Sequence, residues 1–145
     1  MSPAEKAVAD FKQGFTCSQA VLAAFSDRFG LDREKALRIA GGFGGGIGRM
    51  AGPCGAVTGA VMVLGLKYSA TRGDDRETKE KTHMMVREFV RRFTERHESM
   101  VCKDLLGCDI STPEGFKAAH DRDIIKTICP GLVRSAAELV EEMIG

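Results

Sequence analysis

The sequence predicts an all-α fold with a single domain over residues 1–145. Nearly every segment carries apolar residues at helical spacing, and no run alternates with the period of two that marks a half-buried strand. A length of 145 residues is that of one average domain and is sufficient for a hydrophobic core. We therefore expect six or seven helices around a central helix that is rich in small residues.

Capping signals begin each of the first three predicted helices. Ser2 and Thr16 are each followed three residues later by Glu or Gln, which is the spacing of a capping box, and Asp32 is a favoured N-cap residue. Gly14 and Gly30 provide stops after the first two helices. The expected helices cover residues 3–13, 17–29 and 33–40.

A glycine-rich segment and a small-residue helix follow. Six of the eight residues in Gly41–Gly48 are glycine, a composition that favours a tight loop over a helix. Neither a G-x-G-x-x-G register nor a following Gly-Lys-Ser/Thr is present, so we expect this loop to lie beside Cys54 and to bind no nucleotide. The next helix is expected over residues 53–68. Its Gly55-x-x-x-Gly59 face allows close packing, either in the core or in a homodimer.

The second half of the chain predicts four more helical segments. A long amphipathic helix is expected from Asp75 to about Glu98. Capping residues and helix stops then predict a short helix after Ser99 that ends at Gly107, and another that begins at Pro113. We expect the Cys129-Pro130 pair to open the last helix, because proline is favoured in a first helical turn.

Composition excludes several classes of function. A net charge of +1 lacks the basic excess of a nucleic-acid-binding surface, and the chain has no Trp and one Tyr for base stacking. The longest uncharged stretch, Met50–Leu66, is short and contains several glycines, so we expect no membrane span. No signal peptide is evident in the sequence, and we expect a cytoplasmic protein whose cysteines stay reduced.

Four of the five cysteines share a distinctive position. Cys17, Cys54, Cys102 and Cys129 each fall at the start of a predicted helix, where free N–H groups and the helix dipole favour a thiolate. Each also lies on the apolar stripe of its helix, so the four sulfurs are expected to point inward and converge. Cys108 follows Gly107 in a predicted loop and is expected to lie apart. The alternative is that these cysteines are small core residues, since free cysteine is often buried.

The cysteine motifs resemble those of a known family. Cys17 within Phe15–Val21, the run Cys54-Gly55-Ala56-Val57-Thr58-Gly59, and then Cys102 and Cys129 are similar to the C_GCAxxG_C_C family, whose members are described as redox-active. The pattern is also similar to that of a domain in split-Soret-type cytochromes, which implies an iron–sulfur role. The haem-attachment motif of those cytochromes is missing here, so the resemblance implies no haem.

Three functions follow as hypotheses. In the first, Cys17, Cys54, Cys102 and Cys129 bind an iron–sulfur cluster, or zinc as a redox-silent variant, and exchange electrons with a partner protein or sense redox state. In the second, two of these cysteines carry out metal-free thiol–disulfide exchange. In the third, the chain is a helical interaction module that forms a homodimer, and its cysteines are structural core residues. The sequence does not decide whether the protein is an enzyme.

Overall fold

The computed structural model describes residues 1–145 and is entirely helical, which confirms the predicted all-α class. It has eight α-helices rather than six or seven, and two short 3-10 helices continue α2 and α3. The α-helices are α1 (Pro3–Lys12), α2 (Cys17–Ser26), α3 (Arg33–Ala40), α4 (Gly55–Tyr68), α5 (Arg76–His97), α6 (Cys102–Leu106), α7 (Pro113–Asp121) and α8 (Ile124–Ile144). None of them is long and apolar enough to cross a membrane.

The predicted caps form at the first three helices. Ser2 and Thr16 make complete capping boxes with Glu5 and Gln19, and the side chain of Asp32 accepts the N–H of Lys35. These bonds satisfy N–H groups that a helix leaves free in its first turn. Local sequence therefore determines where α1, α2 and α3 begin.

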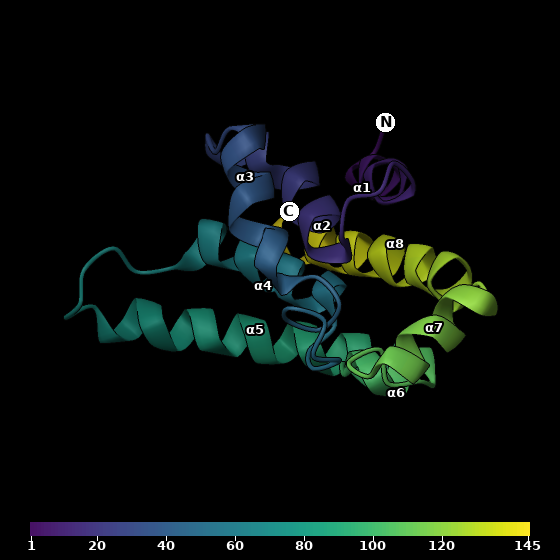
Figure 1. Cartoon of the computed structure of the whole chain (residues 1–145). Coiled ribbons are helices and arrows are strands. Elements are labelled where there is room, and N and C mark those ends of the chain that lie inside the picture. Colours follow the sequence, from purple (N-terminus) through teal and green to yellow (C-terminus); the bar gives the residue numbers. More distant parts are fainter.

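Helix α4 lies in the middle of the molecule and packs against α2, α5 and α8 (Figure 1). Its small residues allow the close approach that we expected. An added Cβ at Gly59 would lie 2.9 Å from the carbonyl oxygen of Ser18, so only glycine fits between α4 and α2. The Gly55–Gly59 face is thus used inside the chain, and a homodimer would need another surface.

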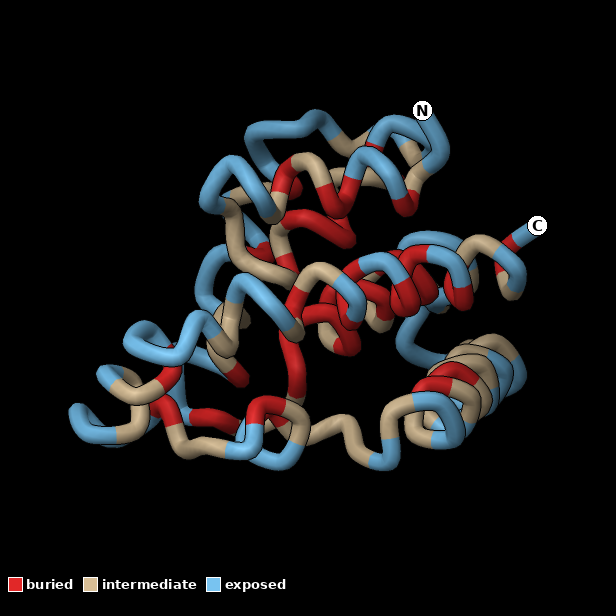
Figure 2. The backbone as a smooth tube through the Cα atoms, turned by 90° about the vertical axis from the view of Figure 1, so that its right-hand side faces the viewer, coloured by how far each residue is buried: buried red, intermediate tan, exposed pale blue.

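The main hydrophobic core forms where α1, α2, α4, α5 and α8 meet. Its largest fully buried side chains include Phe25, Phe89 and Phe93, the last two from the predicted apolar stripe of α5. Buried segments of the chain lie on the inner faces of these helices, and exposed segments lie outside (Figure 2). A second, smaller cluster contains Cys102, Leu106, Ile110, Ala119 and Cys129.

Candidate functional site

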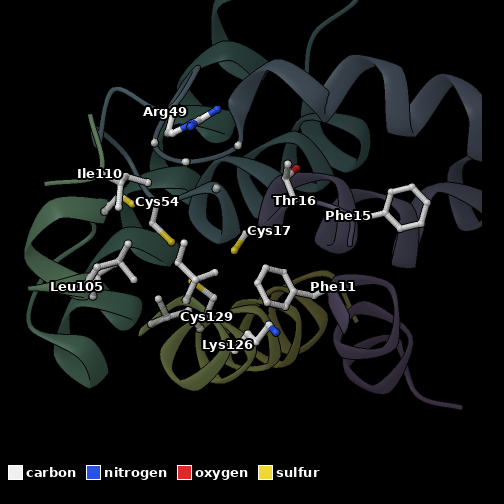
Figure 3. A pocket seen from close by; sticks show the side chains of 18 of the residues that line it. Phe11, Phe15, Thr16, Cys17, Arg49, Cys54, Leu105, Ile110, Lys126 and Cys129 are labelled. Carbon is white, nitrogen blue, oxygen red and sulfur yellow. The ribbon is translucent and has the colours of Figure 1, made fainter. Parts of the chain in front are cut away.

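Four cysteines line one cavity of about 950 Å³, in agreement with the prediction that their sulfurs converge. Figure 3 shows the sulfurs of Cys17, Cys54 and Cys129 directed toward a common space, and Cys102 lines the same cavity. Cys54 belongs to the main core, Cys102 and Cys129 belong to the smaller cluster, and Cys17 packs against both. The sulfurs therefore meet at the junction of the two apolar clusters.

Cys17 is positioned by the cap of α2. It is the first residue of that helix, directly after the capping residue Thr16. The buried hydroxyl of Ser18 donates to the carbonyl of Ala40 at 2.9 Å, and the side chain of Gln19 donates to the carbonyl of Leu37 at 3.0 Å. These two bonds join the start of α2 to the end of α3, where the glycine-rich segment begins.

Cys54 and Cys102 are brought together by a short antiparallel bridge between Pro53 and Val101. The N–H of Cys54 donates to the carbonyl of Met100 at 2.7 Å, and the N–H of Cys102 donates to the carbonyl of Gly52 at 2.7 Å. Cys54 is the N-cap of α4 and Cys102 the first residue of α6, and both are buried. Both cysteines thus lie at helix starts, although α4 begins two residues later than predicted and Val101, not Ser99, caps α6.

The predicted position of Cys129 at a helix start is wrong. Helix α8 begins at Ile124, so Cys129 is its sixth residue and Pro130 lies inside the helix. Proline normally disrupts a helix interior because it lacks an N–H and crowds the carbonyl four residues earlier. Here Leu132 and Val133, which are buried after Pro130, and Ile128, which packs against the core before it, hold both parts of α8 in place. Tertiary packing outweighs the local preference.

Cys108 lies apart from the cavity, as expected. It is half-buried in the loop after α6 and is not among the residues that line the cavity. Its charge would nevertheless contribute to the raised pKa of Cys102, so it is a neighbour of one of the four sulfurs. Cys108 therefore adjoins the centre through Cys102 without lining the cavity.

Burial controls the acidity of two cavity thiols, against the expectation that helix starts would lower it. Desolvation raises the pKa of Cys54 to about 11, although the N–H groups of Ala56 and Val57 partly offset the rise. Desolvation likewise raises the pKa of Cys102 to about 12, with smaller contributions from neighbouring cysteines. A low dielectric disfavours the thiolate more than the helix N-terminus favours it. Both groups are therefore neutral thiols at neutral pH.

Cys17 and Cys129 change each other's pKa in opposite directions. The interaction between the two sulfurs raises the pKa of Cys17 and lowers the pKa of Cys129. Burial and the other three cavity sulfurs raise the pKa of Cys17 further. The first proton lost in the cavity comes from this pair, and the resulting negative charge is stabilised on Cys129.

The glycine-rich segment forms part of the cavity wall beside the sulfurs. Gly44, Gly45 and Gly46 line the cavity together with Cys54, as the sequence predicted. The loop is held by its own backbone bonds, such as that from the N–H of Gly52 to the carbonyl of Gly46 at 3.0 Å. Gly46 has a φ of 74° and is packed against residue 51, so a side chain would not fit there.

The donor set is that of a soft metal, but it is not compact. Four thiols converge from four elements, and thiolates are the ligands that iron–sulfur clusters and zinc prefer. No three His, Cys, Asp or Glu side chains are grouped closely enough to hold one metal ion. In type and number the cysteines match the ligands of such a group, although the sulfurs are not gathered around one point.

Comparison with known proteins identifies a family that is named after the same cysteine pattern. The chain matches the family described as “Putative redox-active protein (C_GCAxxG_C_C)” over residues 15–143, and it belongs to this family. No curated protein and no solved structure matches it. The chain is thus an all-helical member of a family that is described as redox-active and defined by its cysteine motif.

Sequence reasoning missed the residues that surround the sulfurs. Lys12, Arg49 and Lys126 line the cavity, and Arg49 stacks on the ring of Phe116 with its guanidinium carbon 4.1 Å from the ring centre. These residues come from separate parts of the chain and share no motif. Only the fold brings them together.

Proposed function

We propose that this protein is a redox protein whose centre is an iron–sulfur cluster bound by the thiolates of Cys17, Cys54, Cys102 and Cys129. The observation that carries the proposal is the convergence of these four sulfurs, and of no other cysteine, on one cavity. Such a cluster would supply electron transfer or redox sensing in exchange with a partner protein.

Three features of the chain support a buried centre of this kind. The sulfurs lie between two apolar clusters, which would limit the access of water. Metal binding requires thiolates, and a positive metal charge would compensate for the desolvation that raises the pKa of Cys54 and Cys102. First-turn N–H groups at Cys54 could donate toward a ligating sulfur and tune its potential.

Zinc is the redox-silent alternative for the same donor set. Four thiolates around one zinc ion, each about 2.3 Å from the metal, would lie roughly 3.8 Å from one another. No three donors of the cavity are close enough for a single ion, so a zinc site would require the sulfurs to move toward one another.

The second candidate is metal-free thiol–disulfide exchange, which the Cys17–Cys129 pair specifically favours. The thiolate of Cys129 would attack a disulfide of the substrate, forming a mixed disulfide and releasing one substrate thiolate. Cys17 would then lose its proton and attack the sulfur of Cys129, forming the Cys17–Cys129 disulfide and releasing the second thiolate. The two electrons come from the two protein thiols, and the lowered pKa of Cys129 identifies it as the attacking group.

Metal analysis separates these two candidates. The protein would be purified without oxygen, and its iron and acid-labile sulfide would be measured together with its visible spectrum. Iron, sulfide and visible charge-transfer absorption, all lost in Cys54→Ser, are the result that the cluster predicts. A colourless protein without metal, in which Cys17 and Cys129 form a reversible disulfide, would replace the cluster by the second candidate.

We infer a cytoplasmic location from the cysteine chemistry proposed above. The cavity cysteines can serve as metal ligands or redox groups only where they stay reduced, and the cytoplasm keeps thiols reduced. Recovery of the native protein from an oxidising compartment with its thiols paired would contradict this placement.

A further inference from the structure

The cysteine cavity is larger than the sulfurs alone require. At about 950 Å³ it has the size of a pocket for an organic ligand, and its walls include Phe11, Phe15, Leu105, Ile110 and Phe116. Figure 3 shows several of these side chains around the space into which the sulfurs project. A ligand in this space would contact both the apolar wall and the sulfurs.

The charged residues of the cavity are all basic. Lys12, Arg49 and Lys126 line it, whereas none of the 20 acidic residues of the chain does. None of these three cations takes part in a salt bridge. On a chain with a net charge of only +1, such a segregation of charge favours a negative ligand in the cavity.

Three glycines of the cavity wall, close to Arg49 in the chain, have backbone donors without a backbone acceptor. The N–H groups of Gly44, Gly45 and Gly46 donate to no backbone carbonyl, and all three residues line the cavity. Successive free N–H groups commonly bind anions. Arg49 is held against Phe116, which limits the positions that its guanidinium can take.

We propose that the cavity binds an aromatic or aliphatic organic anion. Its carboxylate or phosphate is held by Arg49 and the glycine N–H groups, and its apolar body lies over the sulfurs. This inference deepens the proposed redox function by naming the chemical class of a small substrate or effector at the same centre. Carboxylates and phosphates are both anions whose oxygens accept hydrogen bonds from a guanidinium and from backbone N–H groups. The binding experiment below distinguishes the two.

Charge-matched thiol reagents test this site in the reduced protein after removal of any bound metal by a chelator, in a Cys108→Ser background so that only the cavity sulfurs react. The dianionic aromatic disulfide dithiobis(nitrobenzoate) is compared with the uncharged aromatic disulfide dithiodipyridine, each rate being divided by its rate with free cysteine. In both reactions a protein thiolate attacks the reagent disulfide, a protein–reagent disulfide forms, and one aromatic thiolate leaves. The ratio of the two normalised rates reports the preference for a negative charge.

We expect the anionic reagent to be favoured in the parent protein. Arg49→Gln and Lys126→Gln should each lower the ratio roughly two- to five-fold, as expected for an exposed charge pair. The matched control is Arg87→Gln, which removes an exposed, unpaired cation on α5 outside the cavity and should leave the ratio unchanged. A ratio near one in the parent, or an equal fall in Arg87→Gln, would overturn the proposal.

Equilibrium binding provides a second measurement that does not depend on thiol reactivity. Benzoate and phenyl phosphate, which share an aromatic ring, should each raise the melting temperature of the parent protein, whereas benzamide, the uncharged analogue of benzoate, should not. The larger shift identifies the preferred head group. If neither anion shifts the melting temperature and neither disulfide reaches the sulfurs, the cavity admits no such ligand and the inference fails. Iron content or a reversible Cys17–Cys129 disulfide would still support the proposed function in that case.

Discussion

Replacing Gly59 by alanine tests the close approach of α4 to α2, on which the cysteine centre depends. The new Cβ would lie 2.9 Å from the carbonyl oxygen of Ser18 and 3.0 Å from Cβ of Val21, both closer than normal contact. Overpacking of this kind costs about 1–3 kcal/mol, and the better helix propensity of alanine returns at most about 1 kcal/mol. We expect Gly59→Ala to lower the free energy of unfolding by about 1–2 kcal/mol.

Gly65→Ala in the same helix is the matched control. A Cβ at Gly65 would meet only the hydroxyl oxygen of Ser69, at 3.4 Å, so the gain in helix propensity should remain. Urea unfolding under reducing conditions, followed by circular dichroism, would measure both variants against the parent. The reasoning is refuted if Gly59→Ala is as stable as the parent, or if the two variants change stability equally.

Three further predictions concern the cavity and α8. The folded state keeps the proton of Cys54 up to a pKa of about 11, whereas the unfolded chain loses it near 9, so the free energy of unfolding should fall as pH rises from 9 to 11. Cys54 should contribute at most about 3 kcal/mol of this fall, and Cys54→Ala should show a smaller fall than the parent in alkaline urea titrations. Cys17→Ala removes the interaction that lowers the pKa of Cys129, so alkylation of Cys129 at pH 7, measured by mass spectrometry, should become slower; an unchanged rate would mean that the two sulfurs do not interact. Pro130→Ala restores a helix N–H inside α8 and should raise the melting temperature, whereas a proline at a helix start would make this substitution nearly neutral.

The sequence predicted those parts of the fold that depend on local signals. The capping boxes at Ser2 and Thr16 and the stop at Gly30 lie within a few residues of the elements they mark, so they locate helix ends without knowledge of the fold. The inward direction of the cysteines was also predictable, because it follows from the apolar stripe of each helix. These two local facts led us to expect the sulfurs to converge, although the helix-start argument was wrong for Cys129.

Features that depend on tertiary packing were not predictable in this way. The start of α8 at Ile124 is set by burial on both sides of Pro130, which local preference cannot reveal. The raised pKa of Cys102 depends on how deeply the sulfur is buried, whereas the sequence indicates only its helix start. The basic lining from Lys12, Arg49 and Lys126 joins three distant segments, and no sequence pattern connects them.

A redox titration of the five single Cys→Ser variants tests the central claim most directly. The claim is that Cys17, Cys54, Cys102 and Cys129 form one redox centre to which Cys108 does not belong. The visible spectrum and the number of free thiols would be followed against potential, without oxygen, in the parent and each variant. We predict one reversible transition in the parent and in Cys108→Ser, and its loss in Cys17→Ser and Cys54→Ser, since serine is a poor soft-metal ligand and forms no disulfide. Five variants that all keep the transition, or a loss confined to Cys108→Ser, would contradict the account.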